Sequence, residues 1–177
     1  MTLGLDMLFA LGARVGDKIA ARGETLAVAE SSAGGLVSAA LLSRAGASAY
    51  YFGGVVLYTR RSRRLLTELT SDDTAGMRSS SPAWAQVLAR HQRLRFKASW
   101  GLAESGAAGP TGNHYGDPAG HSCLAVDGPV QRERTLRTGS TDRPANMLAF
   151  AMAALQLLDE AVGAAPVPPA AAAQLRA

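Results

Sequence analysis

The sequence has very few residues of the kinds that bind metals or form covalent cross-links, with one cysteine, Cys123, and three histidines in 177 residues. A single cysteine cannot form an internal disulfide. His91, His114 and His121 show no paired ligand spacing with one another or with Cys123, which argues against a zinc site. Cys123 is flanked by apolar residues and is predicted to pack in a buried strand. The sequence therefore implies no metal and no organic cofactor.

The sequence also lacks a run of about 18 uncharged apolar residues, the length that a membrane-spanning helix needs. Its apolar N-terminal segment contains Asp6 and Arg14, unlike the basic start and unbroken apolar run of an export signal. We therefore expect no membrane role and a cytoplasmic protein. The net charge of +4 favours an anionic partner, either a phosphate-bearing small molecule or nucleic acid.

Apolar periodicity predicts helices that alternate with strands. Helices are predicted over residues 8–19, 36–42, 60–69, 82–95 and from 142 onward. Strands are predicted over residues 24–29, 50–58, 96–103, 121–126 and 130–138, the last two joined by a tight Asp127-Gly128 hairpin. This alternation predicts an α/β fold, a three-layer α/β/α sandwich on a mixed, mostly parallel sheet of about five strands with one antiparallel strand. Residues 1–163 are expected to form one domain, and the Ala/Pro-rich residues 164–177 a disordered tail.

The first candidate site is the segment Glu30–Gly35, in which two serines follow a predicted strand and two glycines open a helix. A hydroxyl beside unpaired N-terminal helix amides can take part in phosphate binding or oxyanion stabilisation. The alternative is that Ser31 or Ser32 only caps the helix.

The second candidate is Tyr58, which is followed by arginines at positions 60, 61, 63 and 64. A tyrosine can relay a proton, and arginine can bind a phosphate through two hydrogen bonds. Helical spacing allows Arg60 to share a face with Arg63 or Arg64. An exposed basic helix face is the alternative.

The third candidate is the segment Ser105–Gly112, which continues through Asp117. It lies within the glycine-rich stretch 104–120, whose composition predicts a long loop. Glycines let a backbone approach a ligand closely, and a structureless connection of this length in a compact domain is often functional. A plain surface loop remains the alternative.

Four ordered motifs closely resemble the CinA C-terminal family, and the resemblance runs from about Leu3 to Val162. The motifs are Ala29–Gly35, Gly46–Tyr50 with Gly53–Tyr58, Ser105–Gly112 and Pro118–Gly120. The resemblance implies a nicotinamide-nucleotide amidase, which converts nicotinamide mononucleotide and water to nicotinate mononucleotide and ammonia. It also implies a homo-oligomer.

The family's catalytic set is serine, tyrosine and lysine, which correspond here to Ser31, Tyr58 and Arg63. Arginine stays protonated and cannot act as a base, so Arg63 is expected to assist electrostatically or bind phosphate, while Tyr58 handles the proton. The matching motif positions imply that substrate is bound by Glu30, Ser32, Gly34, Gly35, Arg60, Ser105, Gly106, Ala108, Gly109, Thr111 and Gly112. Helix amides after Gly34 and the Gly109–Gly112 loop are expected to hold the phosphate or an oxyanion.

Two other functions stay open at this point. The loss of the lysine is compatible with a catalytically silent nucleotide-binding or regulatory module of the same fold. Nucleic-acid binding through the basic stretches 60–64 and 90–97 is less favoured, because no recognised docking motif accompanies the basic charge.

Overall fold

The computed structural model describes residues 4–70 and 72–168, and its strands form one five-stranded sheet in the order β2-β1-β3-β4-β5. The strands are β1 Leu26–Glu30, β2 Tyr51–Val56, β3 Trp100–Ala107, β4 His121–Asp127 and β5 Arg132–Arg137. β1 pairs in parallel with β2 and β3, while β4 pairs antiparallel with both β3 and β5. Four strands therefore run in one direction and β4 runs in the other, which confirms the predicted mixed sheet.

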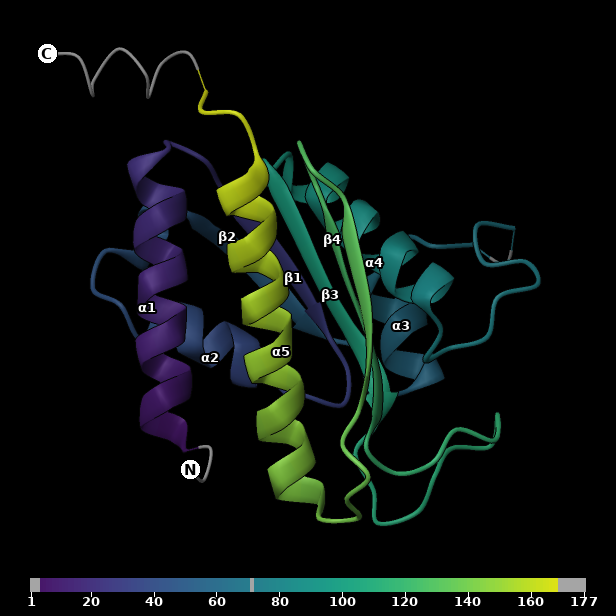
Figure 1. Ribbon diagram of the computed structural model, residues 1–177. Helices are drawn as coiled ribbons and strands as arrows, with labels where there is room; N and C mark the ends of the chain where they lie inside the picture. The colour runs from purple at the N-terminus through teal and green to yellow at the C-terminus, as the bar shows by residue number, and fades with distance from the viewer. Residues whose placement is uncertain (1–3, 71, 169–177) are drawn as a thin grey trace, which may run out of the picture.

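Helices cover both faces of this sheet, as Figure 1 shows. They are α1 Leu5–Ala21, α2 Leu36–Leu42, α3 Arg60–Leu66, α4 Pro82–Phe96 and α5 Arg143–Ala164. α1, α2 and α5 pack together on one face, while α4 covers the other face across β1, β3 and β4. The three-layer α/β/α sandwich is confirmed.

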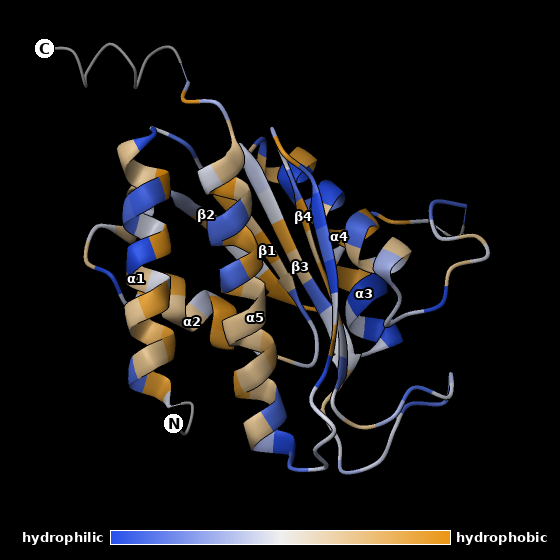
Figure 2. Cartoon of the chain, viewed as in Figure 1, coloured by the Kyte–Doolittle hydropathy of each residue, from blue (hydrophilic) through white to orange (hydrophobic). Residues whose placement is uncertain are grey.

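The main core lies between the sheet and the layer formed by α1, α2 and α5. Its fully buried side chains include Leu8, Tyr50, Trp100, Phe150 and Leu155. Hydrophobic residues follow the central strands and α5, whereas α3 and β5 carry many polar residues (Figure 2). Burying each large apolar side chain contributes roughly 1.5–3 kcal/mol, so this layer supplies much of the fold's stability.

Helix α5 is long and apolar enough to cross a membrane, and it is the one such helix in residues 4–70 and 72–168. The helix includes Arg143, Asp159 and Glu160, so it does not contain a run of about 18 uncharged apolar residues. More than half of its apolar window, 56%, is buried inside the protein, where Phe150 and Leu158 pack in the core.

Strand β3 begins later and ends later than the sequence predicts. Residues 96–99 are not strand, because α4 continues to Phe96 and Lys97 caps it in a left-handed conformation. At the other end β3 continues to Ala107, where it pairs with His121 of β4. Gly106 lies on this strand and pairs with Ser122, and glycine is needed there because a Cβ would meet the His121 carbonyl oxygen at 2.3 Å. Glycine here reflects a close approach of two strands and not a loop.

Two smaller boundaries also differ. Four residues, 128–131, separate β4 from β5, so the predicted two-residue hairpin is wrong. Glycine is needed at position 128 because a Cβ there would meet the Trp100 ring at 2.5 Å. Helix α3 ends at Leu66 and not at residue 69, since Thr67 is already extended. The sequence predicts a disordered tail over residues 164–177. Ala164 is instead the last residue of α5, and residues 169–177 lie outside the described part of the chain.

Candidate functional site

The carboxyl ends of the parallel strands meet at one edge of the sheet, where α/β proteins place their ligands. Ser31 directly follows β1, Tyr58 comes two residues after β2, and Ala108 directly follows β3. Two adjoining cavities open at this edge, and both are lined by Ser31, Tyr58 and Gly106. The topology thus brings together three motifs that lie far apart in the sequence.

We call the first of these the arginine cavity, of about 180 Å³, because Arg60 and Arg63 line it together with Trp84 and Ser105. The second, of about 380 Å³, we call the glycine-loop cavity. Its lining includes Ser32, Ala108, Gly109, Thr111, Gly112 and Arg143. Among residues 4–70 and 72–168, arginines but no aspartate or glutamate line the two cavities, so this part of the site is cationic.

The structure therefore gathers most of the predicted site residues around Ser31, although their chemical roles stay predictions. Glu30, Gly34 and Gly35 line neither cavity. Gly34 and Gly35 have φ values of +69° and +97°, a left-handed conformation that suits glycine, and they make the tight turn into α2.

Glu30 is fully buried and caps α2 from inside the protein. Its carboxylate accepts hydrogen bonds from the backbone N–H groups of Gly35, Val37 and Ser38 at 2.8–3.0 Å. The expectation that these helix amides receive a phosphate or an oxyanion is therefore wrong, because Glu30 already occupies them. A carboxylate at this place satisfies the helix start and its dipole.

A second buried carboxylate, Glu104 on β3, holds the turn that carries Ser31. Its Oε2 accepts from the N–H groups of Ser31 at 3.1 Å and Ala33 at 2.7 Å. Its Oε1 accepts from the hydroxyls of Ser32 and Ser122, the latter at 2.9 Å. Burial raises the pKa of Glu104, against the opposing effect of these hydrogen bonds. Glu104 thus ties the serine turn to the centre of the sheet.

These contacts leave two groups of the serine turn available. The Ser31 hydroxyl, which lines both cavities, makes no hydrogen bond within residues 4–70 and 72–168. Across Ser31–Leu36, the Ser32 N–H is the one amide with no acceptor among the described residues. An N–H directly after a serine is a common oxyanion donor.

Tyr58 is held by an arginine that the sequence motifs do not include. Arg143, the first residue of α5, donates from one terminal nitrogen to the Tyr58 hydroxyl at 2.8 Å. It donates from the other to the Gly109 carbonyl at 2.7 Å. Arg143 thereby joins the tyrosine to the glycine-rich loop across the glycine-loop cavity.

Arg63 makes different contacts from those of Arg143. Its guanidinium carbon lies 4.8 Å from the centroid of the Trp84 ring, and Nη1 donates to the Ser79 hydroxyl at 3.4 Å. The stacking on Trp84 is a cation–π contact. Among the hydrogen bonds of the described residues, Arg143 and not Arg63 is the arginine bound to Tyr58. Arg143, and not Arg63, is therefore the cation placed to stabilise Tyr58 through a hydrogen bond.

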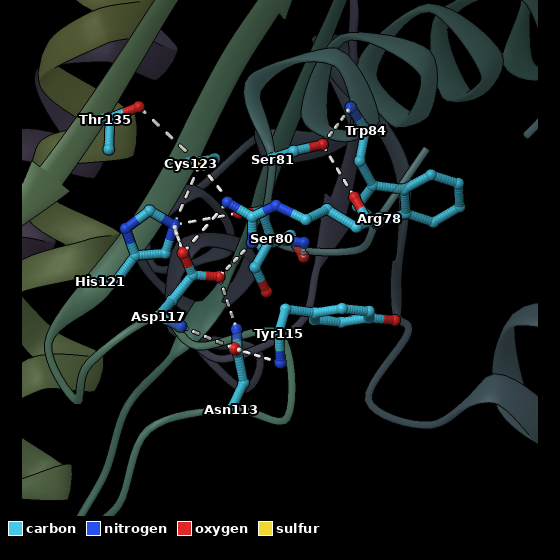
Figure 3. A network of polar contacts seen from close by, with 11 residues as sticks. Arg78, Ser80, Ser81, Trp84, Asn113, Tyr115, Asp117, His121, Cys123 and Thr135 are labelled. Atoms are coloured by element: carbon cyan, nitrogen blue, oxygen red, sulfur yellow. Dashed lines mark hydrogen bonds and ion pairs between the residues drawn. The ribbon is translucent and has the colours of Figure 1, made fainter. Parts of the chain in front are cut away.

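The loop that contributes Asn113, His114 and Tyr115 to the lining of the arginine cavity is held by hydrogen bonds to Asp117. Figure 3 shows this network of polar contacts. Arg78 donates two hydrogen bonds to the Asp117 carboxylate, one of them at 3.1 Å, and Asn113 donates to it at 2.9 Å. His121 donates through Nε2 to the Ser80 carbonyl at 2.9 Å and lies 3.6 Å from Asp117. The hydrogen bond from Arg78 lowers the pKa of Asp117. This network fixes Asn113, His114 and Tyr115 at the cavity.

We expect Asp117→Asn to loosen this loop. Because the pKa of Asp117 is lowered in the folded protein, its carboxylate stabilises the fold above the ordinary aspartate pKa of about 3.9 and ceases to do so as pH falls through the lowered value. Thermal unfolding followed from pH 7 to pH 3 should show a lower Tm for the variant at neutral pH and a difference that narrows in acid. A difference that widens in acid would contradict the assignment.

Arg143 and Glu104 are the important residues that sequence reasoning missed. The sequence predicts a helix start at Asp142, and Asp142 does cap α5 through the Ala145 N–H at 3.1 Å. That signal did not show where the helix begins in space, which depends on the direction of β5. Glu104 was placed at the start of a loop, and only its pairing with Leu124 on β4 reveals it as a central strand residue.

Comparisons with known proteins agree with this architecture. A curated CinA-like protein of Picosynechococcus sp. is 33% identical over 162 residues, which cover 88% of this chain and 38% of that protein. A CinA-like protein of Anaeromyxobacter dehalogenans is 37% identical over 141 residues, which cover 80% of this chain and 35% of that protein. The chain therefore spans well under half the length of these relatives.

Solved structures of similar proteins have the same fold over almost their whole length. A competence-damaged protein (CinA) superfamily protein from Klebsiella pneumoniae superposes with a TM-score of 0.81 at 29% identity, covering 88% of this chain and 98% of that one. The competence/damage inducible protein CihA from Agrobacterium tumefaciens gives a TM-score of 0.80 at 27% identity, covering 92% and 98%. The family model of the CinA C-terminal domain matches residues 9–162, and this chain belongs to that family.

Proposed function

We propose that this chain is a serine amidohydrolase that cleaves the carboxamide of a phosphate-bearing pyridine nucleotide, with nicotinamide mononucleotide as the substrate to test. The observation that carries the proposal is the position of Ser31, whose hydroxyl makes no hydrogen bond among the described residues, where two cavities adjoin. Within that same part of the chain, arginines but no carboxylate line these cavities. A nucleophile placed after a strand and an environment selective for anions are the two features that such a reaction needs.

In the proposed reaction the Ser31 Oγ attacks the carboxamide carbon, and the carbon–nitrogen bond breaks after a tetrahedral intermediate. The Ser32 N–H is placed to stabilise the negative oxygen of that intermediate. The serine proton passes through Tyr58 to the leaving nitrogen, which departs as ammonia. Water then hydrolyses the ester, giving the carboxylate product and restoring the Ser31 hydroxyl.

Arg143 supports the proton-transfer role of Tyr58. A guanidinium only donates hydrogen bonds, so its contact with the Tyr58 oxygen is strongest when that oxygen is negative. Arg63 stays protonated and cannot replace Tyr58 as a base. In this proposal the tyrosine and Arg143 act as a pair.

We expect Arg143→Gln to lower kcat by roughly ten- to a hundredfold with little change in KM, since a charge-assisted hydrogen bond is lost at the proton-transfer step. Steady-state ammonia release measures both constants. Arg143→Lys should recover only part of the activity, because a lysine cannot serve both Tyr58 and the Gly109 carbonyl in the same geometry. An unchanged kcat in Arg143→Gln would remove Arg143 from the mechanism.

The experiment that tests the proposed function is ammonia release by the purified wild-type chain from nicotinamide mononucleotide, with nicotinate mononucleotide quantified in parallel. We expect equal amounts of the two products. Absence of both products from a folded preparation would contradict the proposal.

One observation favours a second candidate, a nucleotide-binding or regulatory module without turnover. Arg63 takes the position of the family's lysine and is stacked on Trp84, where it supplies charge but no base. This candidate predicts calorimetric binding of nicotinamide mononucleotide with no ammonia release. The two candidates are separated by the same assay.

A further inference from the structure

The arginine cavity carries positive charge that the described residues do not neutralise. Arg60 and Arg63 line it, and neither forms an ion pair within residues 4–70 and 72–168. Arg78, in the adjacent segment, is instead paired with Asp117. Unpaired guanidinium groups that face a cavity favour an anion, and above all a phosphate that accepts several hydrogen bonds.

The two guanidinium groups also have donors to spare and a defined placement. Arg60 and Arg63 are three residues apart on α3, a spacing that puts them on one helix face. Arg63 is oriented by its stacking on Trp84, and its only hydrogen bond among the described residues is the 3.4 Å contact with Ser79. Arg60 makes a long contact, 3.5 Å from Nη2 to His114 Nε2. The pKa of the nearby Tyr115 hydroxyl is lowered by a hydrogen bond with Ser79 and, to a lesser extent, by the Arg60 guanidinium. Most of their N–H groups are therefore available to a ligand.

The glycine-loop cavity is the weaker candidate for an anion. Arg143, the one arginine among the described residues that lines it, already donates from both terminal nitrogens to protein acceptors, Tyr58 and Gly109. The amides at the start of α2 are bound by Glu30. The Ser32 N–H remains on this side and suits the oxyanion of the scissile amide.

We infer that the arginine cavity is the phosphate subsite, in which Arg60 and Arg63 bind the phosphate of a substrate whose carboxamide lies against Ser31 and the glycine-loop cavity. Arg63 is then a specificity residue for phosphorylated substrates. The inference rests on the proposed function for the identity of the amide, whereas the phosphate subsite is testable without turnover.

The test compares Arg63→Gln with Arg64→Gln, since Arg64 is exposed on the same helix and lines neither cavity. With nicotinamide mononucleotide, Arg63→Gln should raise KM by about ten- to a hundredfold, the effect of losing charge-assisted contacts to one anion. With nicotinamide riboside, which lacks the phosphate, KM should change less than twofold. Arg64→Gln should match the wild type with both substrates.

Isothermal titration with inorganic phosphate and with nicotinamide mononucleotide separates this inference from the proposed function. Weaker binding of both ligands to Arg63→Gln than to Arg64→Gln supports the subsite even if no amide is cleaved. Wild-type phosphate affinity in an Arg60→Gln/Arg63→Gln double variant would overturn it. An equal rise in KM for the mononucleotide and the riboside would also overturn it, because Arg63 would then not act on the phosphate.

Discussion

Ser31→Ala is expected to lower kcat for amide hydrolysis by a factor of about 10⁴ to 10⁶, the scale of losing a nucleophile in serine hydrolases. The substitution removes a hydroxyl that has no hydrogen-bond partner among the described residues, so neither Tm nor substrate binding should change much. Ammonia release measures the rate, and calorimetric titration with nicotinamide mononucleotide measures the binding.

The matched control is Ser32→Ala, one residue along the same turn. Its hydroxyl is buried and donates to Glu104, so this variant should lose about 1 kcal/mol of stability and keep most of its activity. Ser31→Ala would then lower the rate of hydrolysis with little change in stability, whereas Ser32→Ala would lower the stability with little change in rate. Equal loss of rate in both variants would mean that the turn as a whole, and not the Ser31 hydroxyl, is required.

Glu104→Ala is expected to have the largest effect on stability among the site variants, a loss of about 3–5 kcal/mol in the free energy of unfolding. The side chain is only 1% exposed, and its removal leaves the Ser31 and Ala33 N–H groups without acceptors. Urea denaturation measures the loss. Activity should fall as well, because the turn that carries Ser31 is no longer fixed to β3.

Glu104→Gln tests whether the hydrogen-bond geometry or the negative charge of Glu104 is needed. The glutamine carbonyl can accept from the two backbone N–H groups, while its NH2 donates to the Ser32 and Ser122 hydroxyl oxygens. We therefore expect Glu104→Gln to recover most of the stability and activity lost in the alanine variant. A glutamine variant as damaged as the alanine variant would show instead that the carboxylate charge is essential.

Local signals in the sequence were sufficient for much of the fold and for the centre of the site. Strand and helix periodicity located β1, α2 and the start of α4, which Ser81 caps by accepting through its hydroxyl from the Trp84 N–H at 3.2 Å. Ser31 and Tyr58 come at strand ends, and parallel strands bring such ends together. Cys123 is buried on β4 as predicted.

The remaining features depend on contacts between segments far apart in the sequence. Gly106 indicated a loop, and the pairing of β3 with β4 instead makes it a strand residue in close contact with His121. The motif match to the family implies that Glu30 binds substrate, but its carboxylate instead caps α2, a contact that only the folded turn between β1 and α2 creates. No local pattern could connect Arg143 to Tyr58, 85 residues earlier.

The most direct test of the central claim, nucleophilic attack by Ser31, is mass spectrometry of the Ser31 peptide after acid quench of the wild-type chain turning over nicotinamide mononucleotide. We predict an ester adduct of the nicotinate mononucleotide acyl group on Ser31, and none in the Ser31→Ala chain. Steady ammonia release with the adduct on another residue, or an acylated Ser31→Ala chain, would contradict the account.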